Sequence, residues 1–176
     1  MNREDAGRAG NAHGVTIRRA AWDDAPSIAS VLHRSFAEYR ASYTHEAFIA
    51  TFLTQRQIED CLGEGPVWVA ALDGGIVGTV SAVDRQQALY IRSMAVLPSA
   101  RRRRIGEMLL VEVQRFAVER GYRRLVLSTT PFLDRAIRLY ERLGFRRTDE
   151  GPHDLFGTPL LTMAKAVGAR SPKTMR

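Results

Sequence analysis

The chain of 176 residues has one cysteine, Cys61, and no long apolar segment. A single cysteine excludes an internal disulfide and a zinc site built from cysteines. The longest apolar run, residues 67–72, is far shorter than the roughly 20 residues that a membrane-spanning helix needs. Residues 1–7 lack the apolar core of a signal peptide. We therefore expect a cytoplasmic protein that has no membrane partner.

Several common enzyme motifs are also missing. The chain has neither the Gly-x-x-x-x-Gly-Lys loop of P-loop proteins nor the Gly-x-Ser-x-Gly turn of serine hydrolases. The glycines of residues 74–78 lead into a strand pattern rather than a helix, which excludes a dinucleotide-binding loop. His33, His45 and His153 show no metal-ligand spacing, so we expect no metal.

The length and composition are typical of one globular domain. Apolar residues make up 45% of the chain and charged residues 26%, close to the globular average. Residues 15–167 carry strand and helix patterns and are predicted to form a single domain. Residues 1–14 are small and polar and residues 168–176 are basic, so we expect a disordered N-terminal segment and a flexible tail.

Strand and helix patterns alternate along that domain. We predict strands at residues 15–18, 67–72, 76–83, 89–96, 125–127, from Phe145 and at 160–163, and helices from Asp23 or Asp24 and at 45–62, 103–120 and 134–143. Residues 54–57 resemble a capping box, which would break the 45–62 helix. Residues 125–127 are apolar without interruption, which favours burial on both faces. This order predicts a mixed α/β (α+β) fold with a βαβ unit in the second half.

The charge of the chain is uneven. The net charge is +7, and residues 89–176 carry 18 basic and 8 acidic side chains, against 8 and 11 in residues 1–88. The basic excess raises nucleic acid as a partner. The acidic first half favours a cationic amine as a ligand.

Four adjacent arginines, residues 101–104, lie where a strand gives way to a helix. Cations there oppose the helix dipole by about 0.3–1 kcal/mol each, and Gly106 costs about 1 kcal/mol of helix propensity relative to alanine. Both features become favourable when a phosphate binds the free N–H groups of the first turn. We favour such a phosphate site over nucleic acid because no stacking aromatics lie among the arginines.

One sequence motif contains this arginine run, and a second motif follows it along the chain. The first is Val96-Leu97-Pro98 followed by Arg101-Arg102-Arg103-Arg104-Ile105-Gly106. The second is Ala136-Ile137-Arg138-Leu139-Tyr140-Glu141-Arg142-Leu143-Gly144-Phe145. Together they resemble the signatures of the GNAT superfamily of acyl-CoA-dependent N-acyltransferases, and the resemblance covers residues 15–167. Arg104 stands where the family has its first glycine, and Leu133 where it often has asparagine.

The resemblance implies a splayed central sheet of about six to seven strands, with helices on both faces. It implies transfer of an acetyl group from acetyl-CoA to the primary amine of a small molecule or peptide, by direct attack in a ternary complex. The residues that it places against acetyl-CoA are Met94, Ala95, Val96, Arg101, Arg102, Arg103, Arg104, Ile105, Gly106 and Glu107. A backbone N–H of the first three would stabilise the oxyanion.

The resemblance also makes Tyr140 the general acid, since a phenol with a reference pKa of about 10 keeps its proton at neutral pH. No spacing identifies the general base, for which Glu38 is the candidate that we retain over Glu46 and Asp84. The candidates for acceptor binding are Tyr39, Tyr43, Asp84, Tyr90 and Arg92.

Two alternatives to an acetyltransferase stay open. One is a GNAT-like regulatory domain that binds CoA without turnover, which the departures at Arg104 and Leu133 favour. The other is a basic nucleic-acid-binding module, which we rank lower and do not expect. A homodimer is also compatible with the sequence.

Overall fold

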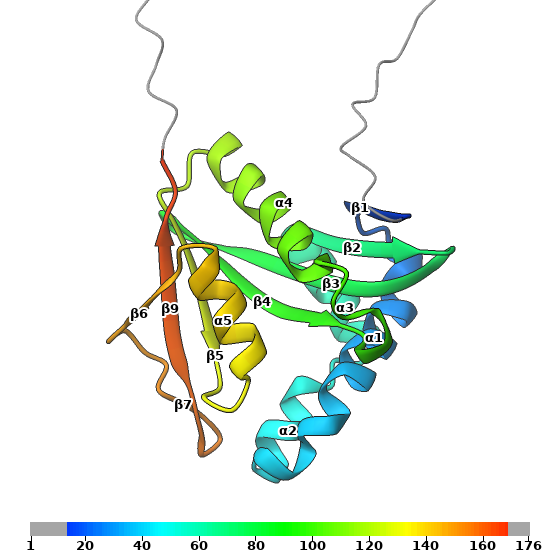
Figure 1. Ribbon diagram of the computed structural model, residues 1–176, viewed down its shortest axis with the longest axis horizontal. Helices are drawn as coiled ribbons and strands as arrows, with labels where there is room; N and C mark the ends of the chain where they lie inside the picture. The colour runs from blue at the N-terminus through cyan, green and yellow to red at the C-terminus, as the bar shows by residue number, and fades with distance from the viewer. Residues whose placement is uncertain (1–13, 169–176) are drawn as a thin grey trace, which may run out of the picture.

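Seven strands form one sheet in the computed structural model of the chain, which describes residues 14–168 (Figure 1). In spatial order they are β1 (Val15–Arg19), β2 (Val67–Leu72), β3 (Gly75–Arg85), β4 (Ala88–Val96), β5 (Arg124–Thr129), β9 (Leu161–Ala166) and β6 (Arg146–Thr148). Neighbouring strands are antiparallel except β4 and β5, which are parallel. The predicted mixed fold is confirmed. Apart from Gly14 and Gly168, the expected N-terminal segment and basic tail lie outside the described residues.

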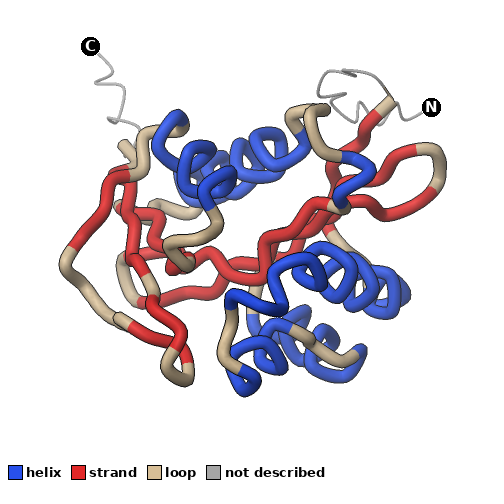
Figure 2. The backbone as a smooth tube through the Cα atoms, turned by 60° about the horizontal axis from the view of Figure 1, so that its bottom comes forward, coloured by secondary structure: helices blue, strands red, loops and turns tan. Residues whose placement is uncertain are grey.

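Helices cover both faces of the sheet (Figure 2). They are α1 (Ala25–Phe36), α2 (His45–Thr51), α3 (Gln55–Glu64), α4 (Ile105–Glu119) and α5 (Asp134–Arg142). Helix α1 packs on β3 and β4, and α4 packs across β1 to β5. The 3-10 turns η1 (Trp22–Asp24) and η2 (Ala37–Ser42) directly precede and follow α1, and η3 (Pro98–Ala100) lies in the loop between β4 and α4. The core lies between the helices and the sheet, where Ile28, Leu89, Leu109 and Leu125 are fully buried.

The break between α2 and α3 is the one that the capping-box pattern predicts. The N–H of Gln57 donates to Oγ1 of Thr54 at 3.3 Å, and the N–H of Thr54 donates to Oε1 of Gln57 at 2.9 Å. These two bonds satisfy backbone donors that have no partner inside α3. The capping box therefore separates α3 from α2, which ends at Thr51.

Two sequence predictions differ from the structure. Val126 of β5 is only partly buried, whereas Leu125 and Leu127 are buried, because alternate side chains of a strand point to opposite faces. The second difference is a hairpin of β7 (Asp154–Leu155) and β8 (Thr158–Pro159), which the sequence analysis did not predict. Strands of two residues have no periodicity for a pattern to reveal.

The sheet splits between β4 and β5. Their pairing covers only Ala88 to Ile91 of β4, and Figure 1 shows the two strands diverging beyond that point. A bulge lies in the half of β4 that does not pair with β5. There the register against β3 shifts, and Ser93 has a φ of 50°. Bulges bend a strand and leave backbone groups outside the ladder. The second half of β4 thus offers backbone groups that β5 does not use.

We expect Gly65→Ala to lower the free energy of unfolding by about 1–3 kcal/mol. A Cβ at Gly65, directly after α3, would stand 2.3 Å from the carbonyl oxygen of Ala82, and a backbone atom cannot move aside easily. The matched control is Gly63→Ala, whose Cβ would meet only Trp22 at 4.0 Å and which gains about 1 kcal/mol of helix propensity. Urea unfolding of both variants tests this, and equal stabilities would contradict it.

Candidate active site

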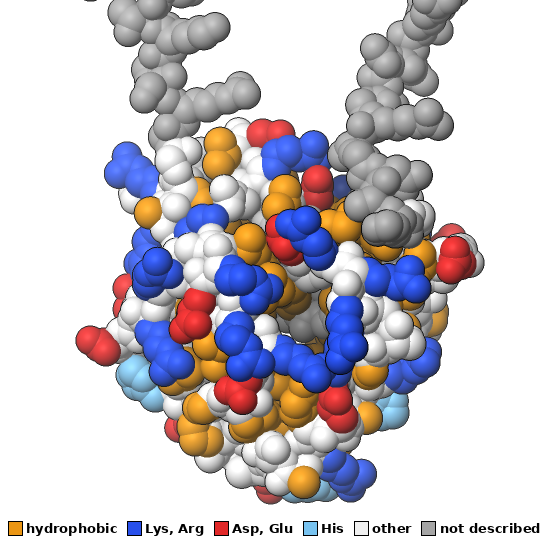
Figure 3. Space-filling view, viewed as in Figure 1, with side chains coloured by type: hydrophobic (Ala, Val, Ile, Leu, Met, Phe, Trp, Pro, Cys, Tyr) orange, Lys and Arg blue, Asp and Glu red, His pale blue; other side chains and the backbone are white. Residues whose placement is uncertain are grey.

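Two cavities adjoin the split between β4 and β5. The larger, of about 520 Å³, lies between the start of α4 and helix α5, and the smaller, of about 210 Å³, lies between α1, α2 and the strands β4 and β5. A space-filling view shows basic side chains around a hollow between α4 and α5 (Figure 3). Four residues line both cavities: Phe36, Met94, Leu133 and Tyr140. The two cavities therefore meet at one place, beside the divergent half of β4.

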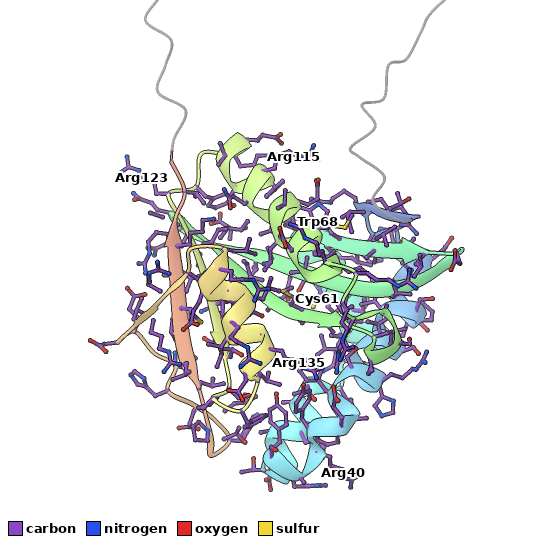
Figure 4. The ribbon with its side chains drawn as sticks, viewed as in Figure 1. Arg40, Cys61, Trp68, Arg115, Arg123 and Arg135 are labelled. Carbon is purple, nitrogen blue, oxygen red and sulfur yellow. The ribbon has the colours of Figure 1, made fainter. Side chains whose placement is uncertain are left out.

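The larger cavity is strongly basic. Its charged lining residues are Arg101, Arg102, Arg104, Arg135, Arg142 and a single carboxylate, Glu107. Arg135 belongs to α5 (Figure 4), so the positive charge comes from both sides of the cavity. Such a concentration of one sign attracts a polyanion.

The loop before α4 has an unusual backbone. Arg102 has a φ of 66° and Arg104 a φ of 59°, both in the left-handed region that favours glycine. Arg104 is the N-cap of α4, and its side chain makes no capping hydrogen bond to the first turn. The N–H groups of that turn thus have no side-chain cap and are available to an anion. The glycine that the family pattern has at this position is replaced here by an arginine with a glycine-like conformation.

Gly106 keeps the larger cavity open at the first turn of α4. A Cβ at this position would lie 2.9 Å from Cδ2 of Leu139 and 3.2 Å from Cε of Met94. Both of these side chains line the same cavity. Gly106 therefore accounts for the close approach of α4 to α5, which a larger side chain would obstruct.

Two arginines of the loop have carboxylate partners. Arg101 forms an ion pair with Glu38 of η2, and Arg104 donates to both carboxylate oxygens of Glu107, at 3.1 and 2.6 Å. The Arg101 hydrogen bond holds the pKa of Glu38 below its usual value, and Arg104 does the same for Glu107. These carboxylates occupy donors that an incoming phosphate would use.

Tyr140 lies at the junction of the cavities. Its side chain is buried, with only 7% of the residue exposed, and Oη donates to Sδ of Met94 at 3.7 Å. Burial raises the pKa of this phenol well above its usual value, with a further contribution from the nearby Tyr43. The hydroxyl is therefore protonated at every physiological pH.

A hairpin closes the far side of the smaller cavity. Leu155 and Leu160, which flank the β7–β8 turn, line it together with Ala50 and Thr51 of α2. The hairpin is attached to the start of α2: Thr44 Oγ1 donates to the carbonyl of Phe156 at 2.8 Å, and the Thr44 N–H donates to Oγ1 of Thr158 at 3.0 Å. No local sequence pattern predicts this contact, because Thr44 is 112 residues from Phe156 and 114 from Thr158.

Residues 28–145 of the chain match the model of the Acetyltransferase (GNAT) family. The chain belongs to this family. Curated relatives agree with the match. The uncharacterized N-acetyltransferase YjgM of Escherichia coli K12 is 29% identical over 138 residues, covering 76% of this chain and 83% of YjgM. The probable N-acetyltransferase camello of Xenopus laevis is 37% identical over 84 residues, covering 46% of this chain and 38% of camello, so the chain spans about two fifths of that relative.

Solved structures share the fold of this GNAT chain. The PaiA N-acetyltransferase of Thermoplasma acidophilum, crystallised with coenzyme A, has a TM-score of 0.75 and 16% identity over 86% of this chain and 98% of PaiA. YncA of Salmonella typhimurium, solved with acetyl-CoA, has a TM-score of 0.70 and 20% identity over 92% of this chain and 99% of YncA. At these identities the likeness establishes the fold.

The GNAT fold brings most of the predicted site residues together. Nine of the ten predicted cofactor residues line the larger cavity, and Arg103 does not. Tyr39 lines the larger cavity, whereas Tyr43, Tyr90 and Arg92 line the smaller. Asp84 lines neither, because it lies near the hairpin end of β3, opposite Leu89.

Sequence reasoning missed several lining residues. They are Arg135 and Arg142 of α5, Ser35 of α1, and residues 128–130 at the end of β5. Ser35 is 5% exposed, and its Oγ has no hydrogen-bond partner. The helical spacing of Arg135 and Arg142 was a usable signal, since residues seven apart lie on one helix face. Among residues 14–168, no cluster of three or more histidine, cysteine or acidic side chains could hold a metal, and no helix there is long and apolar enough to cross a membrane.

Proposed function

We propose that this chain is an N-acetyltransferase that transfers the acetyl group of acetyl-CoA to a primary amine by direct attack. The observation that carries the proposal is the meeting of a basic cavity and a smaller, less charged cavity at Tyr140. A reaction between two bound substrates needs such a shared boundary, since its reacting atoms must come within about 3–3.5 Å. The fold is also that of PaiA and YncA, whose structures hold coenzyme A and acetyl-CoA.

The larger cavity has the features that acetyl-CoA requires. Its arginines and the uncapped first turn of α4 would bind the phosphates. The backbone of β4 at Met94, Ala95 and Val96, which follows the part of β4 that pairs with β5, would hold the pantetheine arm. When bound there, acetyl-CoA supplies an activated acetyl group on a thioester.

Tyr140 would hold and deliver a proton. Its raised pKa keeps the proton on Oη, where the hydroxyl can donate to the sulfur as negative charge develops on the departing thiolate. Burial among Phe36, Met94 and Leu133 excludes water from the hydroxyl and strengthens its hydrogen bond to a developing charge. The phenol thus acts as a general acid.

A turnover assay tests the proposal. Acetyl-CoA is first titrated into the protein, and its binding is measured by the shift in thermal unfolding. Release of free CoA thiol is then followed across a panel of primary amines. Thermal stabilisation together with amine-dependent thiol release is expected. Stabilisation without any release would instead support a regulatory CoA-binding domain. Binding of DNA that weakens steeply with salt, with no response to CoA, would support a nucleic-acid module.

The sequence makes Glu38 the candidate general base, whereas its ion pair with Arg101 favours a role in controlling phosphate binding. Because Arg101 lowers the pKa of this carboxylate, Glu38 has little affinity for a proton and competes with phosphate for the guanidinium. We expect Glu38→Gln to tighten acetyl-CoA binding by up to roughly fivefold, the value of an exposed ion pair of about 1 kcal/mol. We expect kcat to change by less than about threefold, whereas a loss near 100-fold would assign the base to Glu38.

A further inference from the structure

The smaller cavity has an unexpected charge. Arg92 of β4 is the one charged residue in its lining among residues 14–168. The remaining polar lining consists of neutral hydroxyl groups, such as those of Tyr43, Tyr90 and Thr129, beside apolar side chains. The net negative charge of residues 1–88, which favours a cationic ligand, is therefore not found in the cavity wall. A ligand with two amines would have no carboxylate here to pair with its second charge.

Arg92 is held from one side. Its Nη2 donates to Sγ of Cys61 at 3.4 Å and forms an ion pair with Glu64, both residues of α3. Figure 4 labels Cys61, which lies by the central strands. Neither Cys61 nor Glu64 lines the cavity. The two contacts fix the guanidinium through Nη2 and leave Nη1, which makes no hydrogen bond within residues 14–168, for another acceptor.

A second N–H group of the guanidinium also lacks a partner among the described residues. Nε of Arg92 is shielded from solvent without a hydrogen bond, although the side chain as a whole is 31% exposed. A shielded, charged donor without an acceptor is rare, because it loses its hydration without compensation. A planar guanidinium offers a pair of N–H donors that match the two oxygens of a carboxylate.

We infer that the acceptor of this enzyme is a compact amine that carries a carboxylate in the same molecule, as an amino acid does, and that Arg92 binds this carboxylate. The inference rests on the proposed function. The volume of about 210 Å³ is below the roughly 300–1,000 Å³ of pockets for drug-sized ligands, which favours a small acceptor. Leu32, Leu127 and Leu160 supply an apolar wall for its carbon skeleton. The carboxylate on Arg92 and the amine near Tyr140 orient the molecule from its two ends.

The experiment compares matched acceptors in the full-length protein at saturating acetyl-CoA. L-leucine is compared with 3-methylbutylamine, which has the same carbon skeleton without the carboxylate. It is also compared with L-leucinamide, in which a neutral amide replaces the carboxylate. L-phenylalanine and phenethylamine form a second pair. We expect each amino acid to exceed its carboxylate-free partners by about 10- to 100-fold in kcat/KM, the range for a hydrogen bond to a charged group. Equal or better use of the carboxylate-free amines overturns the inference.

Variants connect that preference to Arg92. In Arg92→Gln the ratio of kcat/KM for an amino acid to kcat/KM for its carboxylate-free partner should fall to about one, while the KM for acetyl-CoA stays unchanged. Arg92→Lys, which keeps the charge without the planar donor pair, should retain part of the preference. Arg115→Gln is the charge-matched control, because Arg115 is an exposed residue of α4 that lines neither cavity. A preference that survives in a folded Arg92→Gln protein overturns the role of Arg92.

The assay separates this inference from the function on which it rests. If amines that lack a carboxylate release thiol at the full rate, the acetyltransferase function is supported and the inferred acceptor class is wrong. If no amine releases thiol, both the proposed function and the inferred acceptor are contradicted. Thermal unfolding of each variant verifies that Arg92→Gln is folded, and Arg92→Lys provides the answer if it is not.

Discussion

Replacement of Tyr140 by phenylalanine is expected to lower kcat by about 10²–10⁴-fold and to leave the affinity for acetyl-CoA unchanged. The substitution removes one oxygen from the junction of the two cavities and keeps the ring that packs beside Phe145, with centroids 5.9 Å apart. The lost hydrogen bond to Met94 is long, at 3.7 Å, so the fold should lose little stability. Single-turnover kinetics would place the loss in the chemical step.

Tyr122→Phe is the matched control for this variant. Tyr122 also has a raised pKa through burial, but it packs on Phe116 and lines neither cavity. Its substitution should therefore leave kcat unchanged. Full turnover by Tyr140→Phe would show that another group protonates the thiolate, and a large rise in the KM for acetyl-CoA would show that Tyr140 acts in binding instead.

The second large effect is expected from Gly106→Glu, which should weaken acetyl-CoA binding by at least about 100-fold, equivalent to about 2.7 kcal/mol. The new side chain would project toward Leu139 and Met94 and occupy the larger cavity at the first turn of α4. It would also place a carboxylate where the arginines attract an anion, and like charges at a binding site repel. Isothermal titration with CoA measures the change.

Gly63→Glu is the control for the same substitution. Gly63 is an exposed glycine of α3, and a Cβ there would meet only Trp22 at 4.0 Å. This variant should bind CoA as the unmodified protein does. An unchanged CoA titration in Gly106→Glu would contradict the assignment of the loop and α4 to the phosphates.

Much of the fold follows from local patterns. The capping box at Thr54, Gly121 after α4 and Gly144 after α5 end or begin helices where the sequence predicts, because each acts through backbone groups within a few residues. The conformation of Arg104 does not follow from a local pattern. The family pattern has a glycine at its position, and only the structure shows that the arginine takes the same left-handed conformation.

The candidate site was predictable where its residues are contiguous. The arginine run, Gly106 and Tyr140 lie in two motifs, each on one loop or helix, so their chemistry is visible from their order. The ion pair of Arg101 with Glu38 joins residues 63 apart, and that of Arg92 with Glu64 residues 28 apart. No periodicity connects such positions, so the partners of both arginines appear only in the folded chain.

The sequence alone therefore predicted the order of the main strands and helices, a phosphate-binding loop and Tyr140 as the acid, since these predictions depend on propensity, capping, charge and motifs along the chain. The tertiary structure decided where they meet. The sheet splits after Ile91, and the packing of α1, α2 and α5 around that split brings Phe36, Met94, Leu133 and Tyr140 to one point between two cavities. Among residues 14–168 it also leaves Arg92 as the one charged residue that lines the smaller cavity, because burial and separation between elements, rather than residue type, decide which charges reach a cavity.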